Sequence, residues 1–455
     1  MKKKNDFITS RFERTSVGLY AFGTILSYYM IMSYLQLYMT NIGISAVAVG
    51  LIFIFAKVWD AVNDPIFGVM VDKVQLKGGK YRPWLRISTI AIPVTTVLLF
   101  IVPANASVQA KIIWSSVAYV LWDTAYTMCD VPMNSIVTAM TESSFERNKM
   151  YSLNAFFVYL GGLLVAIAVP MMYPTIGWGM TAILLSAISM LTMAFVGFKA
   201  RERYTPKSDK EASVKDIILS LVHNKYLLIY TLSAIVGSIF DFSSSLNAYM
   251  AIHCLGDASY ITPLSLASAV PVLFVVLFVP KLIEKTEKFR TYIVTRIATI
   301  VVSLVIYLVG YQNFGLLLIL IVLKTLFTSV WGIMAVMFIA DCVEYGQYRN
   351  GERNQGIAFA TKAFTNKIIV AITGSLAMFG LAACGFVEGE GVVQSARTVQ
   401  GIWNLYSLGA IVGSVFSMLI LIGYKLRDAD VKTMIRFNKG EITREEAEAA
   451  FTRKF

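Results

Sequence analysis

Residues 57–73 read KVWDAVNDPIFGVMVDK, and this stretch lies inside a long apolar run although it carries three aspartates. Two of them, Asp60 and Asp64, fall where a membrane-spanning helix is normally most hydrophobic. A charged side chain at that depth costs several kcal/mol unless it is paired or hydrated. Carboxylates in such a position therefore indicate a partner or a ligand, and the rest of the sequence must show which.

The composition is that of a helical membrane protein. Of the 455 residues, 57% are hydrophobic and 15% are charged, whereas about a quarter of a soluble domain is charged. Apolar segments of about 20 residues, long enough to cross a bilayer, alternate with short polar breaks. The first segment follows a basic N-terminus, but it is too long for a removed signal peptide and lacks a small-residue cleavage site.

The apolar segments predict an all-α membrane protein with twelve transmembrane helices. The expected spans are 17–39, 46–72, 85–103, 110–140, 151–173, 178–198, 226–253, 260–280, 291–311, 314–341, 355–386 and 400–424. Of the 40 Lys and Arg residues, 32 fall in the N-terminal segment, the C-terminal segment and the breaks on the same side, against two on the other side. The positive-inside rule then places both termini in the cytoplasm of a multi-pass cell-membrane protein. The net charge of +12 thus reflects topology, and we expect no nucleic-acid partner.

The longest polar break divides the chain into two halves. We expect an N-terminal six-helix half at 1–198, a cytoplasmic linker at 199–225, a C-terminal six-helix half at 226–424 and a cytoplasmic tail at 425–455, with a short helix in the tail. The triplet Glu-Arg-Asn occurs at 146–148 and again at 352–354. The first triplet lies just before predicted helix five and the second just before predicted helix eleven. These helices are six apart, as a parallel repeat of six helices predicts.

The sequence argues against an enzyme. Its four cysteines and two histidines are scattered over separate segments, without the spacing of a metal site. No phosphate-binding loop, nucleophile elbow or zinc-protease motif occurs. We therefore expect no catalytic residues and no cofactor other than a coupling cation.

Helix two presents a polar stripe. Lys57, Asp60 and Asp64 have the spacing i, i+3, i+7, which places them on one helical face, and Asn63 lies beside them. Carboxylate and amide oxygens suit Na⁺ or Li⁺, and two close carboxylates also suit a proton because one of them has a raised pKa. The alternative is structural: Asp60 or Asp64 pairs with Lys57 or with Lys367 of helix eleven.

Helix four carries a second pair of carboxylates, Asp123 and Asp130, again on one face. Asp130 lies near Pro132, where freed backbone could line a cavity, so Asp130 is the stronger site candidate. Trp122 could line the same cavity, although aromatic packing is the commoner role. On helix seven, Asp241 has either a site role or a structural one.

Three segments of this sequence resemble a known family. They are WDAVNDPIFG (59–68) followed by GKYRPW (79–84), YVLWDTAYTMCDVP (119–132) and ADCVEYGQYRNGERNQGIAFA (340–360). They are similar to the glycoside–pentoside–hexuronide:cation symporters, the family of the melibiose permease, and the resemblance covers the whole chain. It implies the major-facilitator fold and co-transport of a sugar with Na⁺, Li⁺ or H⁺. It also implies a cation site at Asp60, Asn63, Asp64 and Asp130, with Lys367 linking the cation and sugar sites.

The sugar contacts of the melibiose permease are not present in this chain. Thr24 and Ile25 replace its acidic residue on helix one, Ala155 replaces its helix-five arginine, and Asn134 replaces the aromatic residue after the helix-four motif. An α-galactoside such as melibiose is therefore not implied. The candidate substrate-binding residues are Trp122, Asp123, Asn134, Asn154, Gln355 and Lys362. The surplus of lysines would suit a uronate or another anionic glycoside.

The resemblance also implies a cytoplasmic gate. Asp72, Lys80 and Arg82 lie in the loop after helix two, and Glu344 and Arg353 lie in the corresponding loop after helix ten. A network of ion pairs between these loops would close the inner side, whereas a single exposed pair would contribute little.

The sequence predicts a cation-coupled sugar symporter that works by alternating access as a monomer in the lipid bilayer. Two alternatives stay open at this point: a lysolipid or other amphiphile symporter of the same superfamily, and a non-transporting sugar sensor. The residues do not decide between Na⁺, Li⁺ and H⁺, and they do not identify the sugar.

Overall fold

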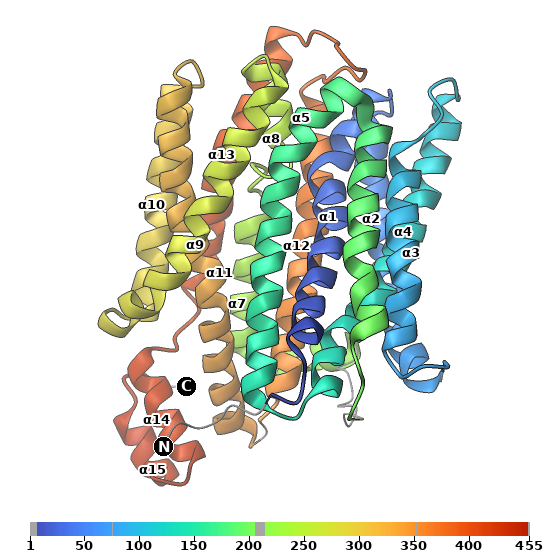
Figure 1. The fold of residues 1–455 in the computed structure, drawn as a ribbon. Coiled ribbons are helices and arrows are strands. Elements are labelled where there is room, and N and C mark those ends of the chain that lie inside the picture. Colours follow the sequence, from blue (N-terminus) through green and yellow to red (C-terminus); the bar gives the residue numbers. More distant parts are fainter. Residues whose placement is uncertain (1–6, 75, 205–213, 352, 454–455) are drawn as a thin grey trace. The chain divides into compact units, whose positions relative to one another are not determined.

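The computed structural model describes residues 7–74, 76–204, 214–351 and 353–453, which form helices and connecting turns without strands in these ranges (Figure 1). The chain divides into two compact units. Unit 1 is Met1–Glu211 with Phe386–Val393, and unit 2 is Ala212–Gly385 with Gln394–Phe455. The boundary between them falls within the predicted 199–225 linker, of which residues 205–213 lie outside the described ranges.

The helices of unit 1 are α1 (Arg11–Asn41), α2 (Ala46–Lys73), α3 (Arg82–Phe100), α4 (Val108–Met140) and α5 (Ser144–Lys199). Helix α1 packs along α5, α3 packs against α4 and α5, and α2 packs against α4. Segment 386–393 joins this unit where the backbone N–H of Gly389 donates to the Thr40 carbonyl at 3.0 Å and that of Glu390 to the Asn41 carbonyl at 3.1 Å. Segment 386–393 therefore belongs to unit 1, although it lies within the C-terminal half expected at 226–424.

The long helices of unit 2 are α7 (Lys225–Ile239), α9 (Ile261–Lys285), α10 (Lys288–Val309), α11 (Phe314–Asn350), α12 (Gln355–Ala383) and α13 (Ala396–Leu421). Its shorter helical segments are α6 (Val214–His223), α8 (Asn247–Tyr249), a π-helical turn (Met250–Cys254), a 3₁₀ turn (Ala258–Tyr260), α14 (Asp428–Asn438) and α15 (Arg444–Ala450). Helix α6 lies within the predicted linker, and the tail contains two helices where the sequence predicts one.

Helix α5 contains two transmembrane passes. Its backbone leaves the helical region at Gly177, where φ is 78° and ψ is 163°. Such a positive φ favours glycine because a side chain would be strained there. The break falls between the expected spans 151–173 and 178–198, so these two predicted helices are both present.

Both units show the same packing pattern. In unit 1 the first helix contacts the α5 passes, the third contacts the fourth and α5, and the second contacts the fourth. In unit 2 the corresponding contacts are α7 with α12 and α13, α10 with α11 and α13, and α9 with α11. Two six-helix units with matching internal contacts are what a parallel repeat produces.

Twelve transmembrane helices follow from these elements. Within the described ranges, nine helical segments are long and apolar enough to cross a membrane, and one of them is the two-pass α5. Helices α1 and α4 have 31 and 33 residues, which is also sufficient length, but polar side chains interrupt their apolar runs. Polar residues inside α1 and α4 are consistent with helices that face the interior of a bundle rather than lipid.

The predicted span 226–253 is confirmed as a candidate membrane span at Lys225–Cys254, but its helix is interrupted. Helix α7 ends at Ile239, and the chain turns before it becomes helical again at Asn247. No glycine or proline marks this break in the sequence. Its cause is local hydrogen bonding, because Asp241 Oδ1 accepts from the backbone N–H of Ser243 at 3.3 Å and from its hydroxyl at 2.5 Å. Asp and Ser side chains compete with helical backbone bonds in this way.

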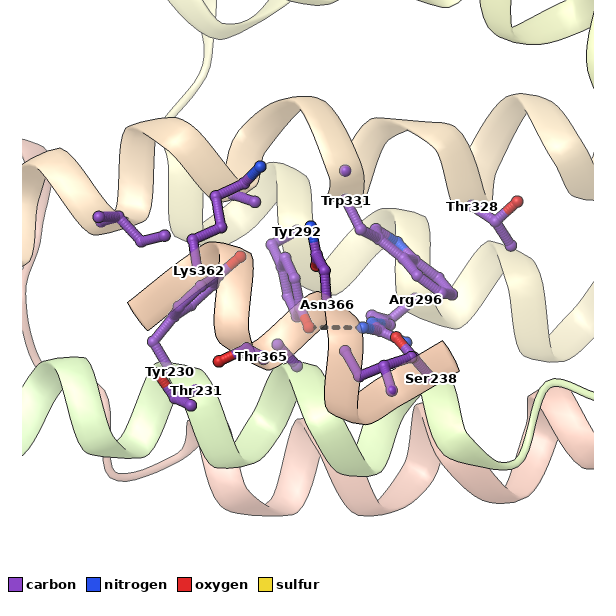
Figure 2. A pocket seen from close by; sticks show the side chains of 15 residues that line it. Tyr230, Thr231, Ser238, Tyr292, Arg296, Thr328, Trp331, Lys362, Thr365 and Asn366 are labelled. Atoms are coloured by element: carbon purple, nitrogen blue, oxygen red, sulfur yellow. Dashed lines mark hydrogen bonds between the residues drawn. The ribbon is translucent and has the colours of Figure 1, made fainter. Parts of the chain in front are cut away.

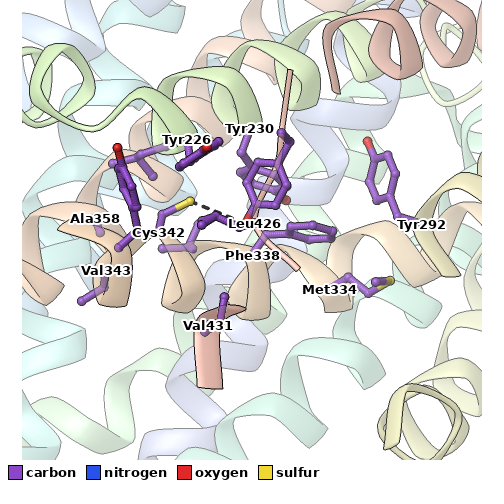
Figure 3. Packing of buried hydrophobic residues seen from close by; sticks show 14 of the residues in the cluster. Tyr226, Tyr230, Tyr292, Met334, Phe338, Cys342, Val343, Ala358, Leu426 and Val431 are labelled. Carbon is purple, nitrogen blue, oxygen red and sulfur yellow. Dashed lines mark hydrogen bonds between the residues drawn. The ribbon is translucent and has the colours of Figure 1, made fainter. Parts of the chain in front are cut away.

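Each unit has a buried apolar core. In unit 2, Tyr226, Tyr230, Phe338 and Cys342 pack together with residues of the tail, including Val431 (Figure 3). The tail helix α14 therefore packs against α11 rather than standing apart from it. The unit 1 core gathers α3, α4 and the second pass of α5, with Trp84, Leu85 and Met193 among its members.

Replacing Gly409 with valine is expected to abolish the folded yield of the protein. A Cβ atom at Gly409 would lie 2.0 Å from the carbonyl oxygen of Phe240, and backbone cannot rotate away as a side chain can. Helix α13 would have to separate from α7. The matched control is Gly356→Ala, whose Cβ meets nothing within 4 Å. Size-exclusion chromatography of both variants in detergent measures the effect, and a monodisperse Gly409→Val protein would contradict the packing described here.

Candidate cation and substrate sites

A buried ionic cluster joins α2 to α4. Lys57 Nζ lies 3.5 Å from Asp60 Oδ2 and 3.5 Å from Asp123 Oδ1. Asp60 is 6% exposed and Asp123 is 3% exposed. Asp60 therefore forms the ion pair with Lys57 that was the alternative to a cation-binding role, and Asp123 contacts the same ammonium group.

One helical turn further along α2, Asp64 and Asn63 have different surroundings. Asp64 Oδ1 accepts a hydrogen bond from the Thr127 hydroxyl of α4 at 3.2 Å. Asn63 is 3% exposed, and its Nδ2 has no hydrogen-bond partner in the part of the chain that the structure describes. Because Nδ2 is an N–H donor, the group that satisfies it must be an oxygen acceptor, such as a water, and not a cation. The sequence analysis missed Thr127, although it lies four residues after Asp123 on the same face.

Asp130 and Asn134 interact with each other. Asn134 Nδ2 donates to Asp130 Oδ1 at 3.3 Å and to the Asp130 carbonyl at 3.0 Å, and both side chains are exposed. Together with Asp123 and Thr127 they follow one stripe of α4, at spacings of four, three and four residues. A predicted cation ligand and a predicted sugar contact are therefore hydrogen-bonded neighbours.

Trp122 and Asn154 differ in their surroundings. Trp122 is 1% exposed and stacks on Tyr126 with ring centroids 5.2 Å apart, so the structure places it in packing within unit 1. Asn154, in the first pass of α5, is half-buried, and its Oδ1 has no hydrogen-bond partner among the described residues. Of these two predicted substrate contacts, Asn154 has the unused hydrogen-bonding capacity.

A cavity of about 200 Å³ lies within unit 2 between α7, α10, α11 and α12 (Figure 2). Lys362, a predicted substrate contact, lines it together with Asn366, one turn further along α12. Lys367 is the next residue of this helix and is half-buried. Gln355 begins the same helix and is exposed.

Arg296 of α10 is the most buried charged group of this cavity, with 2% of its surface exposed. Its Nη2 donates to the Tyr292 hydroxyl at 2.7 Å and its Nη1 to the Gly237 carbonyl at 3.3 Å, and its Cζ lies 3.3 Å from the Trp331 ring centroid. Arg296 is not among the site residues predicted from the sequence. The available signal was an arginine in the apolar span 291–311.

The break after α7 contains a second intramembrane ion pair. Lys324 Nζ of α11 lies 3.2 Å from Asp241 Oδ1 and 3.3 Å from the Ser243 hydroxyl. The pair satisfies both charges and fixes the turn to α11. This contact assigns Asp241 a structural partner.

The predicted gate residues have partners within their own units. Glu202 accepts from the backbone N–H groups of Lys80, Tyr81 and Arg82 at 2.7, 2.9 and 2.8 Å, and Arg82 Nη2 donates to the Gly197 carbonyl at 3.2 Å. In unit 2, Arg353 Nη2 lies 2.7 Å from Glu344 Oε1. The side chain of Asp72 lies outside the described part of the structure.

Comparison with known proteins agrees with this picture. Residues 16–428 match the family model described as MFS/sugar transport protein. The isoprimeverose transporter of Lactiplantibacillus pentosus is 29% identical, and the alignment covers 93% of this chain and 90% of that protein. The inner membrane symporter YicJ of Escherichia coli (strain K12) is 25% identical, with 89% and 90% covered.

The fold is also found in solved transporters. The crystal structure of the nucleoside transporter NupG superimposes with a TM-score of 0.70 and covers 91% of this chain and all of that one, at 12% sequence identity. At this identity the likeness concerns the fold alone. Together with the family match, it identifies the twelve helices as the major-facilitator fold with two six-helix halves. The chain is therefore a membrane transporter, not an enzyme, and it belongs to the MFS/sugar transport protein family, among the glycoside–pentoside–hexuronide:cation symporters.

Proposed function

We propose that this protein couples the uptake of a sugar or glycoside to the entry of a monovalent cation. The observation that supports the proposal is the run of oxygen ligands between α2 and α4. Asp64 accepts a hydrogen bond from the Thr127 hydroxyl at 3.2 Å, and the Asn63 side chain is buried next to it on α2. Hard monovalent cations take carboxylate, hydroxyl and amide oxygens, and a proton can bind to a carboxylate.

Asp60, Asn63, Asp64 and Asp130 are the cation ligands in this proposal. Lys57 is the cationic side chain of this cluster, because its Nζ lies 3.5 Å from a carboxylate oxygen of Asp60 and of Asp123. For Asp60, pairing with Lys57 and binding a cation are compatible when the carboxylate uses different oxygens for the two interactions. Within the described residues, no group of three or more His, Cys, Asp and Glu side chains is placed to hold a metal ion, so Asp60, Asp64 and Asp130 have to approach one another when the cation binds.

The contact between Asp130 and Asn134 suggests how the cation and the sugar interact energetically. Asn134 donates a hydrogen bond to the Asp130 carboxylate. A cation bound at Asp130 would compete with this hydrogen bond and release the Asn134 amide for a sugar hydroxyl. Sugar binding must then raise cation affinity by the same factor, because coupling between two sites is reciprocal. Lys367 is the second proposed link, and Trp122, Asp123, Asn154 and Lys362 are the other substrate-site residues of the proposal.

In the proposed cycle the two halves of a monomer in the cell membrane alternate between outward- and inward-open states. The termini are cytoplasmic, and a network that includes Asp72, Lys80, Arg82, Glu344 and Arg353 closes the inner side. The lining of the unit 2 cavity includes Arg296, Lys362 and Asn366, and these polar side chains favour a sugar over the acyl chain of a lysolipid.

Uptake into proteoliposomes tests this function. A panel of radiolabelled glycosides, pentosides and uronides is offered with an imposed Na⁺, Li⁺ or H⁺ gradient, with protein-free liposomes as control. We expect one substrate class to accumulate above its external concentration with one gradient only. If the sugar concentrations inside and outside become equal whichever gradient is imposed, the protein is a uniporter. A complete lack of sugar movement would refute the proposal.

A further inference from the structure

We propose that segment 386–393 is a latch, which must leave the turn between α1 and α2 before the outer side of the transporter can open. This inference rests on the proposed alternating access and adds a device that controls it. The segment connects α12 to α13 of unit 2, yet it packs with unit 1. The positive-inside rule places both this segment and the α1–α2 turn on the outer side of the membrane.

The latch brings backbone donors to the C-terminal end of α1. The N–H of Gly389 donates to the Thr40 carbonyl at 3.0 Å, and the N–H of Glu390 donates to the Asn41 carbonyl at 3.1 Å. The last four carbonyls of a helix have no partner within the helix, and they form the negative end of its dipole. The Thr40 carbonyl also accepts from the Gly43 N–H at 3.0 Å, and a carbonyl oxygen has room for two donors. The two N–H groups of the latch therefore use acceptors that α1 leaves available.

Glu388 brings a carboxylate to the N-terminal end of α2. Its Oε1 accepts from the backbone N–H of Ala46, the first residue of this helix, at 2.8 Å. The first N–H groups of a helix lack acceptors within the helix, and the positive end of its dipole favours an anion. The hydroxyl of Ser45, the N-cap of α2, accepts from a different N–H group, that of Ala48, at 3.3 Å. The latch thus completes the cap of α2, and its donors and its carboxylate match the two helix ends that meet at the turn.

The start of the latch is attached to α13. The Thr398 hydroxyl is buried and lies 3.1 Å from the carbonyl oxygens of both Cys384 and Gly385. Four residue steps lead from Gly385 to Gly389, so their Cα atoms can be at most about 14 Å apart. The docked latch therefore limits how far this end of α13 can move from the end of α1. Alternating access separates the outer ends of the two halves in the outward-open state, and the latch has to release for that movement.

Hydrogen exchange of the purified full-length protein in detergent tests the docking. The Glu388→Ala variant lacks the carboxylate at α2. Mass spectrometry should show that its amides in segment 386–393 exchange roughly tenfold to a hundredfold faster than in the wild type, as expected when a hydrogen bond to a charged group is lost. Glu390→Ala is the matched control, because it removes an equal charge from an exposed side chain and keeps the backbone N–H. It should exchange at the wild-type rate. Equal exchange in Glu388→Ala and the wild type would overturn the inference.

A disulfide across the latch tests its release. Asn41→Cys and Glu390→Cys are combined in a chain whose Cys254 and Cys384, the two cysteines that are not fully buried, are replaced by alanine. Oxidation should abolish sugar uptake into proteoliposomes and dithiothreitol should restore it, because a cross-linked latch cannot leave the turn. The variant with Asn41→Cys alone should keep its uptake under the same oxidant.

Undiminished uptake by the cross-linked protein would overturn the latch and leave the transport function intact. If the wild type moves no sugar with any gradient, the proposed function fails. The exchange rates of Glu388→Ala and Glu390→Ala do not depend on transport, so they still confirm or refute the docking of segment 386–393.

Discussion

Replacing Asp64 with asparagine is expected to abolish cation-driven accumulation of the sugar. Asparagine keeps the shape of the side chain and one oxygen, so the hydrogen bond from Thr127 at 3.2 Å can persist. It removes the negative charge, and losing a charged ligand weakens cation affinity by roughly tenfold to a hundredfold. If the coupling ion is a proton, the loss is complete, since an amide does not titrate in the working range.

The measurement is uptake against a concentration gradient in proteoliposomes, together with downhill exchange of the same sugar. The Asp64→Asn variant should lose uptake against the gradient and retain part of the downhill exchange, because coupling fails while the sugar site remains. Asp257→Asn is the matched control. Asp257 is exposed in a loop of unit 2 and accepts from the Ser259 backbone N–H, which asparagine can also do. Accumulation by Asp64→Asn at the wild-type level would refute the proposed cation site.

Replacing Lys57 with methionine is expected to destabilise the protein strongly. The change leaves Asp60 and Asp123 buried without the ammonium that lies 3.5 Å from each. Removing one partner of a buried ion pair typically costs about 3–5 kcal/mol. Lys57 keeps 17% of its side chain exposed, so we expect a free energy of unfolding lowered by about 3 kcal/mol. The apparent melting temperature in detergent measures the change.

Neutralising the carboxylates should restore the lost stability. In the triple variant Lys57→Met, Asp60→Asn, Asp123→Asn no charge remains unpaired in the cluster, and replacing a whole buried ionic group is often close to neutral. The control is Lys215→Met, because Lys215 is exposed on α6. A wild-type melting temperature for Lys57→Met, or a triple variant as unstable as the single one, would show that the cluster does not hold α2 to α4.

The sequence predicted the parts of this protein that depend on local properties of the chain. The number of helices and the division near residues 199–225 follow from hydropathy and from polar breaks, which act along a single segment. The polar stripe of α2 also follows from helical spacing alone, because residues three, four and seven apart share a face whatever packs against it. The break inside α5 falls between the predicted spans 151–173 and 178–198, and the structure adds the positive φ of Gly177.

Only the tertiary structure decided which charges meet. Lys57 could have paired with Asp60 alone, and the register of α4 against α2 brings Asp123 to the same ammonium. The break after α7 depends on Asp241 and Ser243 bonding to each other and to Lys324 of α11. Arg296 and Trp331 form one site only because α7, α10, α11 and α12 enclose a common cavity. The contacts of Lys57 with Asp123 and of Lys324 with Asp241, and the walls of the cavity, join segments far apart in the chain, so no periodicity or spacing along the sequence encodes them.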